Sequence, residues 1–256
     1  MIPVKTTAKG VKRSMAQQVF KRIEKKYMLT RPQREALLQA FQGHMRRDEF
    51  GRHTICNLYL DTDDYALTRR SIEKPVYKEK LRLRAYGVPG PGDTVFLELK
   101  KKYKGVVHKR RMELTCQCAM DWLLRGKRPD ADTQIARELD YALRLYRPQP
   151  KVYLCYDREA YFCPDNPDLR ITLDENIRFR TAQVDLTRGA WGTSTLPEGA
   201  TLMEIKIPGA MPLWLAGALS AQRVYPCSYS KVGTVYENYI QPTIQLGGFQ
   251  PCSQVS

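Results

Sequence analysis

The sequence predicts an α+β fold built around an antiparallel β-sheet that is large enough to close into a barrel. At least five segments alternate between apolar and charged side chains, which is the pattern of a β-strand with one buried face. Helical segments with one apolar side lie between several of these strands and are available to cover the sheet. Short turns rich in Gly, Pro and Asp join successive strands, as antiparallel neighbours require.

The first elements follow a leader at 1–18, which we expect to be flexible. The alternating segment 19–29 predicts a strand. Thr30 is a suitable N-cap and Pro32 suits the first helical turn, so a helix is predicted over 31–45. A second strand is predicted over 53–60 and a short helix over 64–71.

A block rich in strands comes next. Alternation predicts strands over 77–85 and 94–103, which the turn sequence GVPGPGD separates. Lys104 and Gly105 form a tight turn, and the segment 106–114 returns as the hairpin partner.

The second half of the chain mixes helices and strands. A helical stretch over 119–146 is broken at 126–130 by GKRPD, and Pro148 and Pro150 end it. Strands are predicted over 152–162, 169–173, 177–181 and 201–207, with a loop at 187–200. A helix is predicted over 208–222, and 241–256 is predicted to be a flexible tail.

Composition narrows the class of protein. The chain has 256 residues and a formal charge of +15, an excess that attracts polyanions without specifying which, although a merely basic surface explains it too. No apolar run is long enough to span a membrane or to act as a secretory signal. The seven cysteines are irregularly spaced and the three histidines are scattered, which predicts reduced thiols in a cytoplasmic protein and no His-based metal centre.

The charged faces of the predicted strands carry mostly Lys and Arg. In KEKLRLR the charged side chains share one face, and Leu81 and Leu83 share the other. An ordinary sheet with one face in water has this pattern as well. Cations on such a face repel one another, however, so we favour a barrel with helices outside and a charged lumen. The same alternation places these side chains on charged faces of four more strands: Arg22, Glu24 and Lys26; Glu98, Lys100 and Lys102; Arg170, Thr172 and Asp174; Glu204 and Lys206.

A lumen lined with Lys and Arg suits a ligand with repeated negative charge. Arg binds phosphate oxygens in a bidentate manner and Lys adds point charge, which favours a triphosphate or a longer phosphate chain. Carboxylates beside phosphates are typical ligands of Mg²⁺ or Mn²⁺, and Glu24, Glu98 and Glu204 are candidates. A salt bridge to a neighbouring Lys is the alternative role for each, and we favour Glu204 as the metal ligand.

Nine short motifs occur in the order typical of the VTC domain, the catalytic domain of the vacuolar transporter chaperone polyphosphate polymerases: RIEKKY, NLYLDT, KLRLR, LELKKK, HKRR, YDREAY, RITLD, MEIK and YSK. The sequence resembles this family over 19–240, and through it the wider triphosphate tunnel metalloenzyme, or CYTH-like, superfamily. The resemblance implies an eight-stranded antiparallel tunnel barrel with helices packed outside. It also implies transfer of the γ-phosphate of ATP to a growing inorganic polyphosphate chain, with Mn²⁺ or Mg²⁺ as cofactor.

The resemblance implies roles for the residues at matching motif positions. Glu204 is implied as the metal ligand. The register of His108, Lys109 and Arg110 leaves open which of them contacts phosphate. The implied catalytic residues that hold phosphates are Lys26, Arg82, Arg84, Lys100, Arg158, Arg170 and Lys231. Further substrate contacts are implied at Tyr156, Lys102, Lys109, Lys206 and Ser230.

One departure bears on the activity. The superfamily signature opens with two alternating Glu before a Lys, but Arg22 stands at the first position, which agrees better with a polymerase than with a simple triphosphatase. Two rivals stay open: a hydrolase of tripolyphosphate or an RNA 5′-triphosphate in the same tunnel, and a non-catalytic module that binds polyphosphate or nucleic acid. Nucleic acid is less favoured because the tyrosines form no stacking platform. Transport of product across a membrane would need a separate membrane partner.

Overall fold

The computed structural model describes residues 23–104 and 106–247, so the predicted leader at 1–18 lies outside the described residues. One antiparallel sheet dominates the described part of the chain. Two-residue strands β2 (Arg46–Arg47), β9 (Thr193–Ser194) and β11 (Pro226–Cys227) supplement it. In the described residues the long strands are eight in number, as the family resemblance implied, whereas alternation predicted nine segments: β1 (Ile23–Leu29), β3 (His53–Asp61), β4 (Tyr77–Tyr86), β5 (Thr94–Tyr103), β6 (Val106–Thr115), β7 (Gln149–Phe162), β8 (Arg170–Arg180) and β10 (Thr201–Ile207).

Helices connect and flank these strands, which confirms the α+β class. Between residues 213 and 247 the helices extend further than the sequence predicted, because α7 occupies the first part of the expected flexible tail. The longer helices are α1 (Arg31–Ala40), α2 (Ala66–Ile72), α3 (Cys116–Arg125), α4 (Gln134–Tyr146), α5 (Leu213–Ala221) and α7 (Gln241–Gly247). The shorter ones are α6 (Lys231–Val235), the π-helix η2 (Tyr236–Ile240) and the 3₁₀-helix η1 (Leu186–Arg188).

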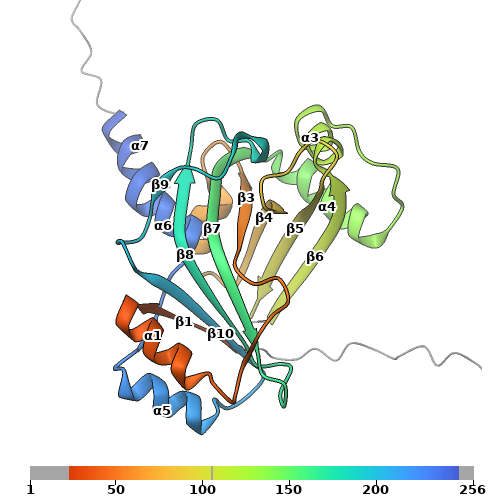
Figure 1. The fold of residues 1–256 in the computed structure, drawn as a ribbon. Coiled ribbons are helices and arrows are strands. Elements are labelled where there is room, and N and C mark those ends of the chain that lie inside the picture. The colour runs from red at the N-terminus through yellow and green to blue at the C-terminus, as the bar shows by residue number, and fades with distance from the viewer. Residues whose placement is uncertain (1–22, 105, 248–256) are drawn as a thin grey trace, which may run out of the picture.

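Two groups of helices cover the apolar side of the sheet (Figure 1). Helices α1 and α5 lie side by side against β1, β8 and β10, while α3 and α4 lie against β5 and β6. The apolar residues of the alternating strands point into these two cores, where Leu81, Leu97, Ile171 and Ile205 are fully buried. The opposite side of the sheet, which we call the inner face, therefore carries the charged residues of the same strands.

The sheet is curled but not closed. Its strand order is β11-β1-β10-β8-β7-β3-β4-β5-β6, and in the described part of the chain no hydrogen-bonded ladder joins β6 to β1. The predicted closed barrel is therefore wrong in this respect. The inner face nevertheless bends around a common space, because Ser230 accepts a 3.0 Å hydrogen bond from Lys80 on β4 while Lys231 lies 3.2 Å from Glu204 on β10. Ser230 and Lys231, which are adjacent in the sequence, thus contact β4 and β10, two strands that β3, β7 and β8 separate in the sheet.

The strand predicted as two pieces, 169–173 and 177–181, is the single strand β8. Its ladder with β7 shifts register between Cys155 and Asp157, and Asn176 adopts a positive φ of 49°. An extra residue in one strand flips the alternation from one face to the other, which is why the sequence pattern looks interrupted.

Two further predictions concern the described residues. The cysteines at 56, 116, 118, 155, 163 and 227 are free thiols, as expected from their spacing. No helix in the described part of the chain is long and apolar enough to cross a membrane.

Candidate functional site

Cross-strand partners place basic side chains in rows on the inner face. Residues opposite each other in an antiparallel ladder share a face. One row joins Lys80, Lys100 and Lys109 across β4, β5 and β6. The next row joins Arg82, Glu98 and Arg111, so a carboxylate interrupts the cations at this level.

Glu98 forms the centre of the first charge cluster. Its carboxylate lies 2.6 Å from Arg82, 2.6 Å from Lys109 and 3.2 Å from Arg111. Burial by itself raises the pKa of Glu98, but the neighbouring Arg82, Arg84 and Lys109 outweigh it and lower the pKa to about 2. Glu98 therefore positions three cations as a salt-bridge partner, which is the alternative that the sequence left open.

Asp174 and Glu204 form the second charge cluster. Arg158 grips Asp174 with two contacts of 2.6 and 2.7 Å, and Lys231 lies 2.6 Å from Asp174 and 3.2 Å from Glu204. Burial opposes ionisation of both carboxyls, but Lys231 and Arg158 hold the pKa of Asp174 below its usual value. Lys231 and Lys26 likewise hold the pKa of Glu204 well below its usual value. Both carboxylates are therefore ionised at neutral pH.

Tyr156 links the parts of the site. Its hydroxyl accepts a 3.3 Å hydrogen bond from Arg84, while Lys231 and Arg158 lie 4.7 and 5.1 Å from the centre of its ring. Such cation–π contacts stabilise cations that are partly removed from water. The predicted substrate contact at Tyr156 thus lies between Arg84 and the second charge cluster.

Several inner-face cations make no ion pair with any described residue. Burial, together with nearby Lys26 and Lys100, lowers the pKa of Lys80 to about 8, although Tyr59 opposes this shift. Charge repulsion is therefore unrelieved here, and an anion would relieve it. The cations without an ion pair to the described part of the chain are Lys78, Lys80, Arg84, Lys100, Lys102 and Arg170.

Glu204 offers an oxygen donor suited to a divalent cation. Its Oε1 lies 3.2 Å from Lys231 and 3.6 Å from Lys26, whereas Oε2 lies 4.0 Å from Lys206. Thr172 is its cross-strand neighbour, and the buried Oγ1 of Thr172 has no hydrogen-bond partner in the described chain. Residues 23–104 and 106–247 contain no cluster of three or more His, Cys, Asp or Glu side chains for a metal. The donors nevertheless fit Mg²⁺ or Mn²⁺ when substrate phosphates complete the shell, because Mg²⁺ commonly binds through one or two carboxylates and phosphate oxygens.

Most of the predicted site residues lie close together on the inner face, but Arg170 and Lys102 lie at its borders. Arg170 is exposed at the first position of β8 and donates a 3.4 Å hydrogen bond to the Pro167 carbonyl. Lys102 is exposed near the end of β5. Since the register places the start of β8 and the end of β5 at opposite ends of the sheet, these two cations mark the two ends of the inner face.

The structure also decides the register of the HKRR motif. Lys109 and Arg111 lie on the inner face opposite Lys100 and Glu98. Arg110 lies on the outer face, where it binds Glu138 of α4 at 3.0 Å. Arg111 was not among the predicted site residues. The turn that the sequence predicts at 104–105 was the available signal, because counting residues outward from that turn along the hairpin pairs Arg111 with Glu98.

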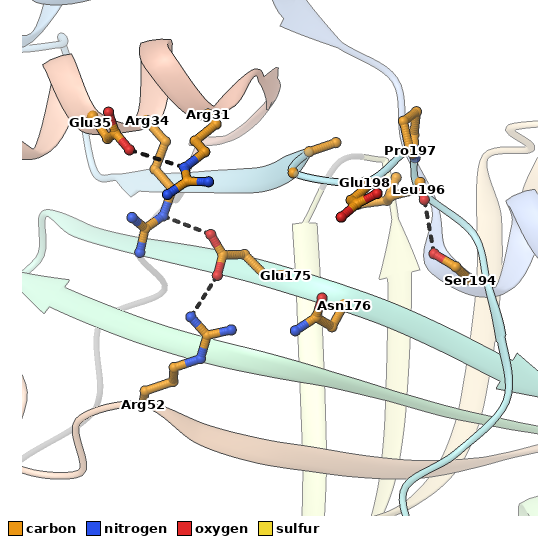
Figure 2. A pocket seen from close by; sticks show the side chains of 12 residues that line it. Arg31, Arg34, Glu35, Arg52, Glu175, Asn176, Ser194, Leu196, Pro197 and Glu198 are labelled. Atoms are coloured by element: carbon orange, nitrogen blue, oxygen red, sulfur yellow. Dashed lines mark hydrogen bonds and ion pairs between the residues drawn. The ribbon is translucent and has the colours of Figure 1, made fainter.

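A separate cavity of about 560 Å³ lies on the outer face beneath α1 (Figure 2). Glu175 lies there between Arg34 and Arg52, at 2.7 Å from each. Three Arg and three Glu side chains line this cavity, so its charges are balanced. The inner face differs from this cavity, because several of its cations have no ion-pair partner among the described residues.

Comparisons with known proteins place this arrangement in a family. No curated protein matches the sequence. Among solved structures, a proposed adenylate cyclase from Bacillus halodurans is 16% identical, with 86% of this chain and 95% of that one covered and a TM-score of 0.51, which shows a shared fold. A proposed adenylyl cyclase from Hippeastrum, described as having a dominant triphosphatase activity, is 16% identical, with 91% and 100% covered and a TM-score of 0.47. The family model described as the VTC domain matches residues 21–238, and the chain therefore belongs to the VTC domain family.

Proposed function

We propose that the inner face is the active site of a polyphosphate polymerase, which transfers the γ-phosphate of ATP to a growing inorganic polyphosphate chain. Six inner-face cations that make no ion pair with any described residue support this proposal. They occur on β4, β5 and β8 and thus extend from one end of the face to the other. A ligand with evenly repeated negative charge matches such a series better than a single phosphate does.

The arrangement suggests a division of roles. Arg82 and Arg84 would hold the β- and γ-phosphates, with Lys80 and Lys100 beside them, while Glu98 keeps the Arg82 guanidinium in place. Lys26 and Lys206 flank Glu204 and reinforce the positive field at the second charge cluster. Most of the rate enhancement in phosphoryl transfer comes from such positioning and charge stabilisation.

The bond changes place few demands on the protein. A terminal oxygen of the acceptor chain forms a bond to the γ-phosphorus, the bond from that phosphorus to the β–γ bridging oxygen breaks, and ADP leaves with the electron pair. An ionised terminal phosphate has no proton to lose, so no general base is needed. A Mg²⁺ or Mn²⁺ ion held by Glu204, with Thr172 nearby, would neutralise charge on the phosphate oxygens.

Hydrolysis in the same site is the second candidate. An attacking water must lose a proton, and Glu98, Asp174 and Glu204 are weak bases because their pKa values are lowered. Lys80 is the observation in favour of a hydrolase, because its pKa of about 8 leaves part of the population neutral, and so able to accept a proton, as pH approaches 8. Bound phosphate would raise that pKa again, so we favour transfer to phosphate over transfer to water.

Product analysis distinguishes these possibilities. The purified protein is incubated with ATP and Mn²⁺ or Mg²⁺, with and without a short polyphosphate primer, and the products are resolved on a gel. Chains longer than the primer support the polymerase, whereas free phosphate without longer chains supports the hydrolase. If neither product forms while polyphosphate still binds, the protein is a binding module and the proposal fails.

A further inference from the structure

We propose that a cluster of aromatic side chains at one end of the inner face binds the nucleobase of the nucleoside triphosphate. This inference rests on the proposed function, since it assigns a second part of the same substrate. It concerns Phe50, His53, Tyr86 and Phe96, which we call the aromatic cluster. None of these four residues is explained by phosphate binding.

The aromatic cluster is continuous. The ring of His53 lies 6.3 Å from that of Phe50 and 5.9 Å from that of Tyr86, and Tyr86 lies 5.7 Å from Phe96. The four rings come from the loop before β3, the start of β3, the end of β4 and the start of β5. Because neighbouring strands are antiparallel, these segments meet at the same end of the sheet.

The cluster lies on the same face as the phosphate-binding arginines. Tyr86 follows Arg84 by two residues on β4, so both side chains point to the inner face, roughly 7 Å apart along the strand. Phe96 is the cross-strand partner of Arg84, and His53 is the partner of Arg158. A nucleoside triphosphate whose phosphates bind Arg84 therefore has an aromatic surface within reach of its base.

Two rings of the cluster are open to a ligand. Phe50 is 69% exposed and Tyr86 is 52% exposed, although each contacts His53. A nucleobase stacks on such rings whatever its hydrogen-bonding pattern, since every base has a π-face. Phe96 is not available in the same way, because the guanidinium of Arg111 lies 3.6 Å from its ring centre.

Arg111 connects the aromatic cluster to the first charge cluster. Besides its contact with Phe96, it donates a 2.9 Å hydrogen bond to the Tyr86 hydroxyl and lies 3.2 Å from Glu98. Glu98 in turn binds Arg82 at 2.6 Å. A chain of three polar contacts through Arg111 and Glu98 thus links Tyr86 to a phosphate-binding arginine, so the proposed base site adjoins the proposed phosphate site.

The test compares a nucleotide with inorganic tripolyphosphate, which has the phosphates but no base. Calorimetry measures the Kd of the non-hydrolysable adenosine 5′-(β,γ-imido)triphosphate and of tripolyphosphate, both with Mg²⁺. Phe50→Ala and Tyr86→Ala are expected to weaken nucleotide binding about tenfold and to leave tripolyphosphate binding within about twofold. Tyr86→Phe keeps the ring and should keep the nucleotide affinity. Tyr141→Ala, which removes a 63% exposed ring from α4, is the matched control and should change neither Kd.

The outcomes separate this inference from the proposed function. If the alanine variants bind both ligands as the unchanged protein does, or lose both to the same degree, the aromatic cluster is not a base site and the inference is overturned, although the phosphate site stands. If the unchanged protein binds neither ligand, the proposed function falls together with the inference. Selective loss of nucleotide affinity in Phe50→Ala supports it most directly, because no contact links Phe50 to Arg111 among the described residues.

Discussion

The ammonium group of Lys231 lies 2.6 Å from the carboxylate of Asp174, and both side chains are buried. Lys231 begins α6, whereas Asp174 lies in the middle of β8, so this pair fixes the C-terminal helices to the inner face. Burial alone would lower the pKa of Lys231, yet Asp174 and Glu204 raise it well above its usual value. Removing one charge of such a pair leaves the other buried without its partner, which is costly.

Lys231→Met is therefore expected to lower the free energy of unfolding by about 3 kcal/mol, which is the lower end for a broken buried pair because Arg158 still binds Asp174. Urea unfolding followed by circular dichroism measures the difference. Lys25→Met, at an exposed position of β1, should change the same quantity by less than about 0.5 kcal/mol. Equal stability of the two variants would contradict a structural role for the pair.

Arg82→Ala should abolish the formation of phosphate chains and leave the fold intact. Removing one charged donor from the transferred phosphate costs about 10²- to 10³-fold in kcat. Initial rates of ADP release and of chain growth measure the loss, and circular dichroism checks the fold. Arg125→Ala removes an exposed arginine from α3 and should keep full activity. Substantial activity in Arg82→Ala would rule out the assigned role of this residue.

The lowered pKa of Glu98 predicts that the folded protein loses stability in acid. Its pKa is about 2 in the folded protein and about 4.3 in an unfolded chain, so its contribution is present above pH 4.3 and is lost as pH falls towards 2. Glu98→Gln should therefore be less stable than the unchanged protein by about 3 kcal/mol at pH 6, and this gap should shrink as pH falls from 5 to 3. Urea unfolding at each pH measures the gap. Glu237→Gln, at an exposed position, should not change the slope of stability with pH. A stability difference that stays constant over this pH range would contradict the lowered pKa of Glu98.

The lowered pKa of Lys80 predicts that the affinity of the protein for phosphate chains depends on pH. Its pKa of about 8 lies below the solution value near 10.4, so the cation is lost as pH rises through 8. Affinity for tripolyphosphate should fall about tenfold between pH 7 and 9, as expected when a charged hydrogen-bond donor becomes neutral. The pKa of Tyr59 is also about 8, because Arg82 and Lys80 outweigh its burial, and its ionisation acts in the same direction. The double variant Lys80→Arg with Tyr59→Phe should bind with little dependence on pH, and a fall equal to that of the unchanged protein would refute the assignment.

The sequence was sufficient to predict which side chains share a face of each strand, but not whether the sheet closes into a barrel. Alternation in β4, β5 and β10 separates residues such as Leu81 from Arg82, because strand geometry leaves no other choice. Whether the first and last strands pair depends on twist and on the helices, which alternation does not encode. The contact of Lys231 with Asp174 was not predictable either, because it depends on where α6 packs. The bulge in the β7–β8 ladder misled the prediction for a similar reason: one extra residue reverses the pattern.

Lys102 and Arg170 should distinguish a long phosphate chain from a short one. Both are exposed, make no ion pair with the described residues and lie at opposite ends of the inner face. A short ligand held by Arg82 and Arg84 does not reach both ends, whereas a long chain does. Lys102→Ala and Arg170→Ala are therefore expected to weaken binding of long-chain polyphosphate by about five- to tenfold each, since a charged hydrogen bond contributes about 1.5 kcal/mol or slightly less when exposed. Tripolyphosphate binding should change by less than twofold in both variants.

Calorimetry with the two ligands at equal ionic strength measures these affinities, and Arg125→Ala serves as the control for loss of one surface charge. Equal effects on both ligands would mean that these two cations act only through the general positive field, and that the chain does not follow the inner face from one end to the other.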